Sequence, residues 1–229
     1  CRPRSSQPRT RGTFLPLPPR EGWGECVRGG RLDRIDVNTD LTLDPKLTYG
    51  PLRVVASGIS IDGRGATVQG VGFNGVGIRA EAIVNVTLRN LRVRGFNLGL
   101  HVSNGASWLI EDCDFSDNFH DLDWGWDSRP PAGGILLEKV RNTTVQRCRA
   151  NHVWDACHLV NSHDNVIARN DFSHTSDTCL KLWASTRNEV RANNLSHGIR
   201  ISPGEVHARD AVCVLIESGS HANRFLDND

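Results

Sequence analysis

The sequence predicts an all-β chain wound into a parallel β-helix, a solenoid of about seven coils built from short strands. Three observations support this prediction. One pattern of apolar residues recurs six times, its spacing is close to 22 residues, and strand-like segments lie between the copies. A unit of this length cannot bury its apolar face alone, so successive units are expected to stack around one continuous core.

The six copies share an apolar anchor residue that is followed three positions later by Leu, Cys or Asn. Successive anchors are separated by 22, 35, 22, 23 and 35 residues, which indicates a single period with one insertion in each long interval. The insertions are assigned to residues 117–133 and 198–210. The anchors are predicted to form one inward-facing column, made of Leu88, Ile110, Val145, Ile167, Val190 and Phe225.

Before each anchor lies a second short segment in which apolar and polar residues alternate, the period that strands require. The strands are expected to stack at about 4.8 Å per coil. Asn170 and Asn193 lie one repeat apart and predict an amide ladder. These second segments lie at residues 77–80, 99–102, 134–137, 156–160 and 178–183.

The repeat places the β-helix domain at residues 31–229, with regular coils from about residue 52. Residues 1–30 are rich in Arg, Pro and Gly without periodicity, so we expect an irregular tail that can be removed. The last residues fall within a coil, which predicts a solenoid truncated at its C-terminal end.

The composition limits the classes of partner that the chain can bind. The 27 Lys and Arg residues nearly balance the 26 Asp and Glu residues, so the chain lacks the strong positive field that nucleic-acid binding needs. No apolar run approaches the roughly 18 to 20 residues of a membrane helix. Four cysteines lie within strand-like segments and no CxxC pair occurs, so we interpret them as small buried side chains. They are Cys113, Cys148, Cys157 and Cys179.

The two insertions leave the same edge of the solenoid three coils apart, about 14 Å at the stacking distance. They are expected to form the walls of a groove. On its floor the repeat aligns His152, His174 and His197, and then Asp155 with Asp177. Because Cys157 and Leu159 point inward, His158 is expected to face outward. The outward column predicted from this alternation contains Arg79, His101, His158 and Lys181.

Each side chain of the groove has a possible role. Elimination or epimerisation at a uronic acid needs a base, for which His152, His174 or Lys181 is expected. It also needs cations that neutralise the carboxylate, for which Arg79, His158 or Arg200 is expected. Hydrolysis instead needs paired carboxylates, and Asp155 with Asp177 would supply them. The alternative is that these aspartates are turn residues that open the next strand. Sugar contacts are further predicted for His101, Trp124, Trp126, Trp154 and His207.

The first insertion combines tryptophans with carboxylates. Flat aromatic rings among hydrogen-bonding groups suit sugars, although Trp126 could equally anchor the insertion to the solenoid. Asp121, Asp123 and Asp127 are spaced loosely like Ca²⁺ ligands, so a calcium site is a weaker prediction; no other cofactor is indicated.

The stretches IDGRGATV, NVTLRNLRV, GILLEKVRNTTV, NVIARNDFS and NEVRANNLS resemble the right-handed parallel β-helix repeat family over about residues 52–229. This family includes pectate lyase-like enzymes, alginate epimerases, and periplasmic carbohydrate-binding and copper-maturation proteins. The resemblance implies a right-handed helix, a polysaccharide or oligosaccharide partner, an extracellular, periplasmic or cell-surface location, and a monomer. It leaves three classes open: a polysaccharide lyase, epimerase or glycoside hydrolase; a non-catalytic sugar-binding or surface solenoid; and a metal-handling periplasmic protein.

Overall fold

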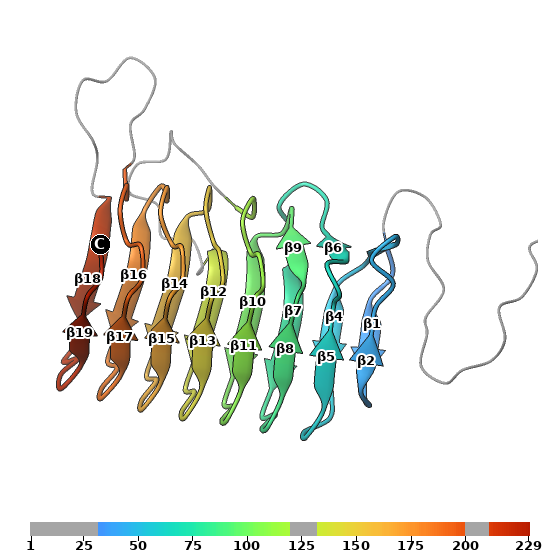
Figure 1. The fold of residues 1–229 in the computed structure, drawn as a ribbon, viewed down its shortest axis with the longest axis horizontal. Helices are drawn as coiled ribbons and strands as arrows, with labels where there is room; N and C mark the ends of the chain where they lie inside the picture. Colours follow the sequence, from blue (N-terminus) through green and yellow to red (C-terminus); the bar gives the residue numbers. More distant parts are fainter. Residues whose placement is uncertain (1–31, 120–131, 200–210) are drawn as a thin grey trace, which may run out of the picture.

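The structure is a computed structural model that describes residues 32–119, 132–199 and 211–229. All its strand pairs are parallel, and the strands stack as three sheets along one solenoid (Figure 1). The first sheet contains β1 (Ile35–Val37), β4 (Leu52–Val54), β7 (Val76–Glu81), β10 (Leu98–Ser103), β12 (Gly133–Glu138), β14 (Asp155–Val160), β16 (Thr178–Trp183) and β18 (Val212–Glu217).

The second sheet runs beside it for the same number of coils. It contains β2 (Leu41–Thr42), β5 (Ser60–Asp62), β8 (Thr87–Arg89), β11 (Leu109–Glu111), β13 (Thr144–Gln146), β15 (Val166–Ala168), β17 (Glu189–Arg191) and β19 (Arg224–Leu226). The third sheet is shorter and contains β3 (Thr48–Tyr49), β6 (Thr67–Gln69) and β9 (Arg92–Arg94). The predicted parallel β-helix is therefore confirmed, and pairing begins at β1, before the start near residue 52 that the repeat indicated.

The predicted column of anchors is confirmed by the register of the second sheet. Ile110 lies between Leu88 and Val145, and the column continues through Ile167 and Val190 to Phe225. The first five anchors are fully buried, and Phe225 is 37% exposed because β19 is the last strand of its sheet. A single apolar core therefore runs along the solenoid, as the 22-residue period requires.

The predicted amide ladder is also present. The side chain of Asn170 donates to Asn193 Oδ1 at 2.9 Å, and Asn193 donates to Asn228 Oδ1 at 2.9 Å. Each side chain also bonds the backbone of a neighbouring coil, for example Asn193 Nδ2 to the carbonyl of Ile167. Buried amides can be kept at this position because the stacking of identical coils satisfies their donors and acceptors.

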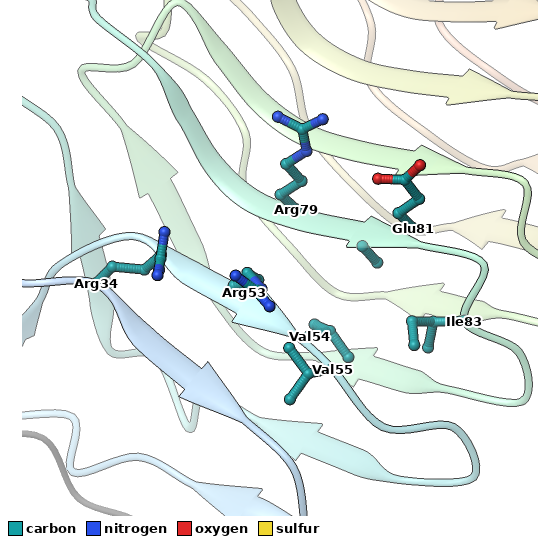
Figure 2. A pocket seen from close by; sticks show the side chains of 8 residues that line it. Arg34, Arg53, Val54, Val55, Arg79, Glu81 and Ile83 are labelled. Carbon is teal, nitrogen blue, oxygen red and sulfur yellow. The ribbon is translucent and has the colours of Figure 1, made fainter.

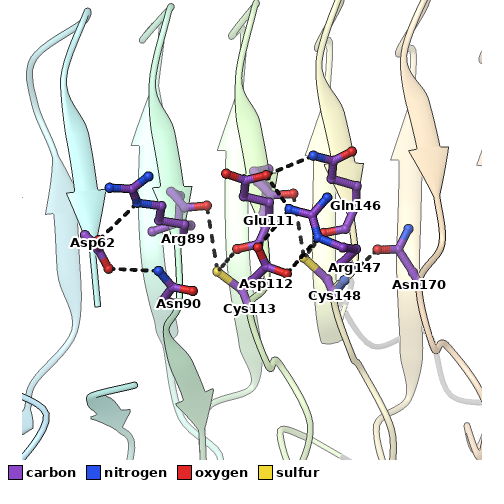
Figure 3. A network of polar contacts seen from close by, with 12 residues as sticks. Asp62, Arg89, Asn90, Glu111, Asp112, Cys113, Gln146, Arg147, Cys148 and Asn170 are labelled. Carbon is purple, nitrogen blue, oxygen red and sulfur yellow. Dashed lines mark hydrogen bonds and ion pairs between the residues drawn. The ribbon is translucent and has the colours of Figure 1, made fainter. Parts of the chain in front are cut away.

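Beside this ladder, ion pairs join adjacent coils (Figure 3). Arg147 Nη2 lies 2.6 Å from Glu111 Oε2 and 2.8 Å from Asp112 Oδ2, and Arg89 pairs with Asp62. The ion pair holds the pKa of Asp112 below its usual value. The arginines of these pairs are exposed, and ion pairs at the surface add little stability, so we interpret them as support for the coil register.

The interpretation of the cysteines is confirmed. Cys113, Cys148, Cys157 and Cys179 are buried and not disulfide-bonded, while Cys213 on β18 is exposed. Burial raises the pKa of Cys157 well above its usual value, so this thiol stays protonated. The four buried cysteines therefore belong to the core and are not a reactive site.

Candidate functional site

The outer face of the first sheet carries the column that strand alternation predicted. Arg79 pairs in register with His101, and His158 with Lys181. Leu136 lies between the two pairs, and Arg53 precedes them on β4. From Arg53 to Lys181 the column therefore contains five basic or imidazole side chains and Leu136; Asp36 precedes it on β1 and Leu215 follows it on β18. Sequence reasoning missed Arg53.

Asp155 begins β14 and lies against β12 at its pairing partner Gly133. Gly133 has φ 113°, and a Cβ at this position would collide with the backbone carbonyl of Asp155. Only glycine lets the two strands approach this closely without strain. The close approach fixes the strand that carries Asp155, Cys157 and His158.

The carboxyl group of Asp155 is buried among polar neighbours. Its residue is 4% exposed, and Oδ1 has no hydrogen-bond partner. Burial, followed by the charge of Asp177, raises the pKa of Asp155 to about 8, against the opposing effect of the Lys181 charge. Asp155 therefore holds a proton at neutral pH, in contact with a second carboxyl group.

His158 lies beside this pair, with Nδ1 3.9 Å from Asp155 Oδ2. Its side chain is 11% exposed, and neither ring nitrogen has a hydrogen-bond partner. Burial, followed by the charge of Lys181, lowers the pKa of His158 to about 4. We expected an accessible cation that neutralises a substrate carboxylate; His158 lies on the outer face but is buried and neutral, so this expected role is not supported.

Two members of this group reach the surface. Asp177 and Lys181 are half-buried, and the Thr178 hydroxyl lies 3.4 Å from Asp177 Oδ2. We call Asp155, Asp177, His158 and Lys181 the acid–base cluster. It combines a protonated carboxyl group, a second carboxyl group, a neutral imidazole and an ammonium group, so it can donate a proton, accept one and stabilise negative charge.

Aromatic side chains approach the acid–base cluster from the preceding turns. Trp154 is half-buried, and its ring centroid lies 6.1 Å from that of Phe119, which lies 6.5 Å from Phe73. The backbone amide of Asp177 bonds the carbonyl of Trp154, so the aromatic turns stack directly beside Asp177. Sequence reasoning missed Phe73 and Phe119, although the 35-residue interval aligns Phe119 with Trp154 and could have revealed it.

The predicted histidine column is present in the turns before β14 and β16. The ring of His174 lies 6.0 Å from that of His152 and 4.6 Å from that of His197, in a parallel stack with the latter. All three residues are exposed and adopt positive φ of 51° to 59°, a conformation in which histidine is enriched. His174 also contacts Ser173 Oγ at 2.8 Å. Two explanations are therefore open for histidine at these three positions: a role in catalysis, as predicted, and the preference of the turn for a residue that tolerates positive φ.

Several predicted residues cannot be placed. Trp124, Trp126, Arg200 and His207, with the calcium candidates Asp121, Asp123 and Asp127, lie outside the described residues. His101 contacts Glu138 Oε2 at 3.2 Å. Within the described ranges, no group of three or more His, Cys, Asp or Glu side chains could hold a metal ion. The calcium site and the groove walls therefore stay predictions.

The fold and the cluster together define a parallel β-helix protein with a polar site on the outer face of one sheet. The chain belongs to the family described as Right handed beta helix region, which matches residues 57–229. No curated protein matches the sequence. In the described part of the chain, no helix is long and apolar enough to cross a membrane.

Solved structures with this fold include an alginate lyase from Paenibacillus sp. str. FPU-7. The TM-score is 0.67 and the identity 10%, over 85% of this chain and 75% of that chain. The A-module of a mannuronan C-5 epimerase from Azotobacter vinelandii is also similar, at 10% identity over 86% and 76% of the chains, but its TM-score of 0.33 supports no argument. At such identity the first similarity shows a shared fold and nothing about activity.

Proposed function

We propose that this chain is a carbohydrate-active β-helix enzyme that transfers a proton at a uronic acid of an acidic polysaccharide, as a lyase or an epimerase. The observation that carries the proposal is the buried Asp155, 3.9 Å from His158 and close enough to Asp177 and Lys181 for their charges to act on its pKa. A buried carboxyl group with a raised pKa beside other titratable groups is typical of acid–base catalysis. The shared fold with an alginate lyase is consistent with this proposal.

The exposure of each side chain in the acid–base cluster indicates its role in the reaction. Asp177 and Lys181 are half-buried and can contact a sugar, whereas Asp155 and His158 are buried behind them. Asp177 is therefore the catalytic acid–base group. Asp155 is a positioning residue, whose protonated carboxyl group lies behind Asp177. Lys181 neutralises the uronate carboxylate as negative charge develops on it.

The step balances with these groups. Asp177 takes the C5 proton, and the electron pair of the C5–H bond is stabilised through the uronate carboxylate beside Lys181. In elimination this pair forms the C4–C5 double bond as the C4–O bond breaks, and the leaving oxygen takes its proton from a solvent water, with Asp177 later returning the C5 proton to solvent. In epimerisation a solvent water instead supplies a proton to the opposite face of C5, and Asp177 again releases the C5 proton to solvent.

Hydrolysis is the weaker alternative for this pair. Carboxyl groups of retaining glycosidases lie roughly 5 to 5.5 Å apart, and those of inverting enzymes roughly 6.5 to 9.5 Å apart. Asp155 is 4% exposed, so its carboxyl group is not open to a sugar as the acid or nucleophile of a glycosidase must be. A polysaccharide partner, a location outside the cytoplasm and a monomeric state belong to this proposal as well.

The test is a screen of the chain against polygalacturonate, alginate and a neutral glucan. It should follow the ultraviolet absorbance of unsaturated uronate, reducing ends, and sugar configuration by NMR. We expect turnover of an acidic polymer, and a loss of about 100-fold or more in Asp177→Asn and Lys181→Met. The control Asp227→Asn changes an exposed carboxylate on the last coil and should keep full activity.

Other outcomes contradict the proposal in distinct ways. Reducing ends without unsaturated product would indicate a hydrolase. Sugar binding without turnover, unaffected by Asp177→Asn, would favour the sugar-binding solenoid.

A further inference from the structure

A second polar feature lies on the outer face of the first sheet, over β1, β4 and β7. It is a cavity of about 560 Å³ lined by Arg34, Arg53 and Arg79. The other lining residues are Val54, Val55, Ala80, Glu81 and Ile83, of which Val54 and Ala80 are buried and belong to the core. Figure 2 shows Arg53 and Arg79 on the adjacent strands β4 and β7. We call this feature the arginine pocket.

Three arginines of the arginine pocket lie near two carboxylates, Glu81 in its lining and Asp36 in register beside Arg53, which leaves an excess of positive charge. Arg34 pairs with Asp36 at 3.1 Å. Among the described residues, Arg53 and Arg79 form no ion pair with any carboxylate, although they lie in register one strand apart. Like charges at one strand spacing, about 4.8 Å, repel each other. Two guanidinium groups that form no ion pair match a ligand that offers carboxylates.

The arginine pocket and the acid–base cluster lie in one line. Arg53 and Arg79 belong to the same outward column as His158 and Lys181. Three strand steps separate Arg79 from His158, about 14 Å, and five separate Arg53 from Lys181, about 24 Å. His101 and Leu136 fill the steps between them. An extended polymer parallel to the solenoid axis would pass over both features.

We propose that the arginine pocket is a remote subsite that binds carboxylates of the acidic polysaccharide turned over at Asp177, with the sugar chain along the solenoid axis. This inference rests on the proposed function for the identity of the polymer. Because one strand step is comparable with the length of one sugar unit, a chain must contain about five or six units to reach both features. A trisaccharide reaches only the acid–base cluster.

The experiment compares trisaccharides with octasaccharides of polygalacturonate and of alginate, using Arg53→Ser, Arg79→Ser and their double variant. Calorimetric binding is measured on the inactive Asp177→Asn chain carrying the same substitutions. Turnover is measured on chains that retain Asp177. Arg169→Ser is the matched control, because Arg169 is an exposed arginine that follows β15 of the second sheet.

We expect the KM and Kd of the octasaccharide to rise roughly tenfold or more, since contacts with charged groups are strong. The trisaccharide values, kcat and the control should stay unchanged, and added salt should weaken the octasaccharide effect. An octasaccharide KM and Kd unaffected in the double variant would overturn the subsite. An equal rise in KM and Kd for the trisaccharide and the octasaccharide would also overturn it, because it would indicate a long-range effect of positive charge and not a contact with the distal sugar units. Arginine-dependent octasaccharide binding without any turnover would keep the subsite and remove only the proposed enzymatic activity.

Discussion

Two stacks of polar side chains run along this solenoid, and they differ in one respect. In the ladder beside the second sheet, Asn170, Asn193 and Asn228 bond one another and the backbone of adjacent coils. In the acid–base cluster on the first sheet, Asp155 Oδ1 and both nitrogens of His158 are buried without a partner. Both stacks arise from the same repeat.

The difference separates scaffold from site. A ladder of identical amides satisfies every coil, and its burial then contributes to stability. Unlike groups in register cannot satisfy one another in this way, and a buried polar atom without a partner costs roughly 1 to 3 kcal/mol. We interpret the unpartnered atoms at β14 as a loss of stability that is kept because the residues there have a function. Substitutions in the amide ladder should therefore lower stability, whereas substitution of Asp155 should raise it.

The largest stability loss is expected in the ladder. Asn193→Ala removes the hydrogen bonds that Asn193 makes with Asn170, Ile167 and Asn228. We expect the free energy of unfolding to fall by roughly 2 to 4 kcal/mol, measured by urea denaturation, because several buried groups lose partners at once. Asn74→Ala, at an exposed loop residue, is the control and should cost far less. A loss below about 1 kcal/mol for Asn193→Ala would contradict the scaffold role, and turnover per folded molecule should not change.

The next effect concerns acid stability. Because the folded chain lowers the pKa of His158 to about 4 from 6.5, the unfolded chain binds the proton more readily. The stability linked to neutral His158 is complete above pH 6.5 and is lost as the pH falls toward 4, by roughly 1 to 3 kcal/mol.

Urea denaturation of the parent and of His158→Gln between these pH values isolates this contribution, since the variant lacks the titrating group. The two curves should diverge as the pH falls, with the parent losing more. Parallel curves would mean that His158 titrates normally and is accessible.

The smallest stability effect is expected in the histidine column. His174→Asn keeps a side chain that tolerates positive φ, and His174 is exposed, so the free energy of unfolding should change by less than about 0.5 kcal/mol. Binding or turnover of an acidic polymer should fall if His174 acts at the site, where the sequence predicted it as a candidate base; KM and kcat are measured together. A variant that loses stability while KM is unaffected would assign the column to the scaffold.

The sequence was sufficient for the register and insufficient for the burial. The period of 22 residues and the alternation within strands place Ile110 over Leu88 and His158 beside Lys181, because a parallel coil leaves no other register. Alternation gives the face of a strand and not what covers that face, so the burial of Asp155 and His158 could not be predicted. Asp155 and Asp177 were foreseen on adjacent coils, but the raised pKa of Asp155 depends on that burial.

Two residues were missed because the repeat pattern carries no information about them. Arg53 belongs to a coil too divergent for the repeat alignment, and Gly133 acts through a backbone conformation that no pattern of side chains reveals.

The central claim is that Asp155 is buried for function at a cost in stability, and Asp155→Asn tests it most directly. At pH 7 the unfolded chain ionises Asp155, whose ordinary pKa is 3.8, while the folded chain keeps it protonated. The folded state is therefore penalised above pH 3.8, increasingly up to about pH 8, and the penalty disappears at lower pH. Urea denaturation should show Asp155→Asn to be more stable than the parent by roughly 1 to 3 kcal/mol at pH 7 and equal to it below about pH 4, with turnover lost. A variant that is less stable at pH 7 and retains turnover would show that Asp155 is a scaffold residue like Asn193.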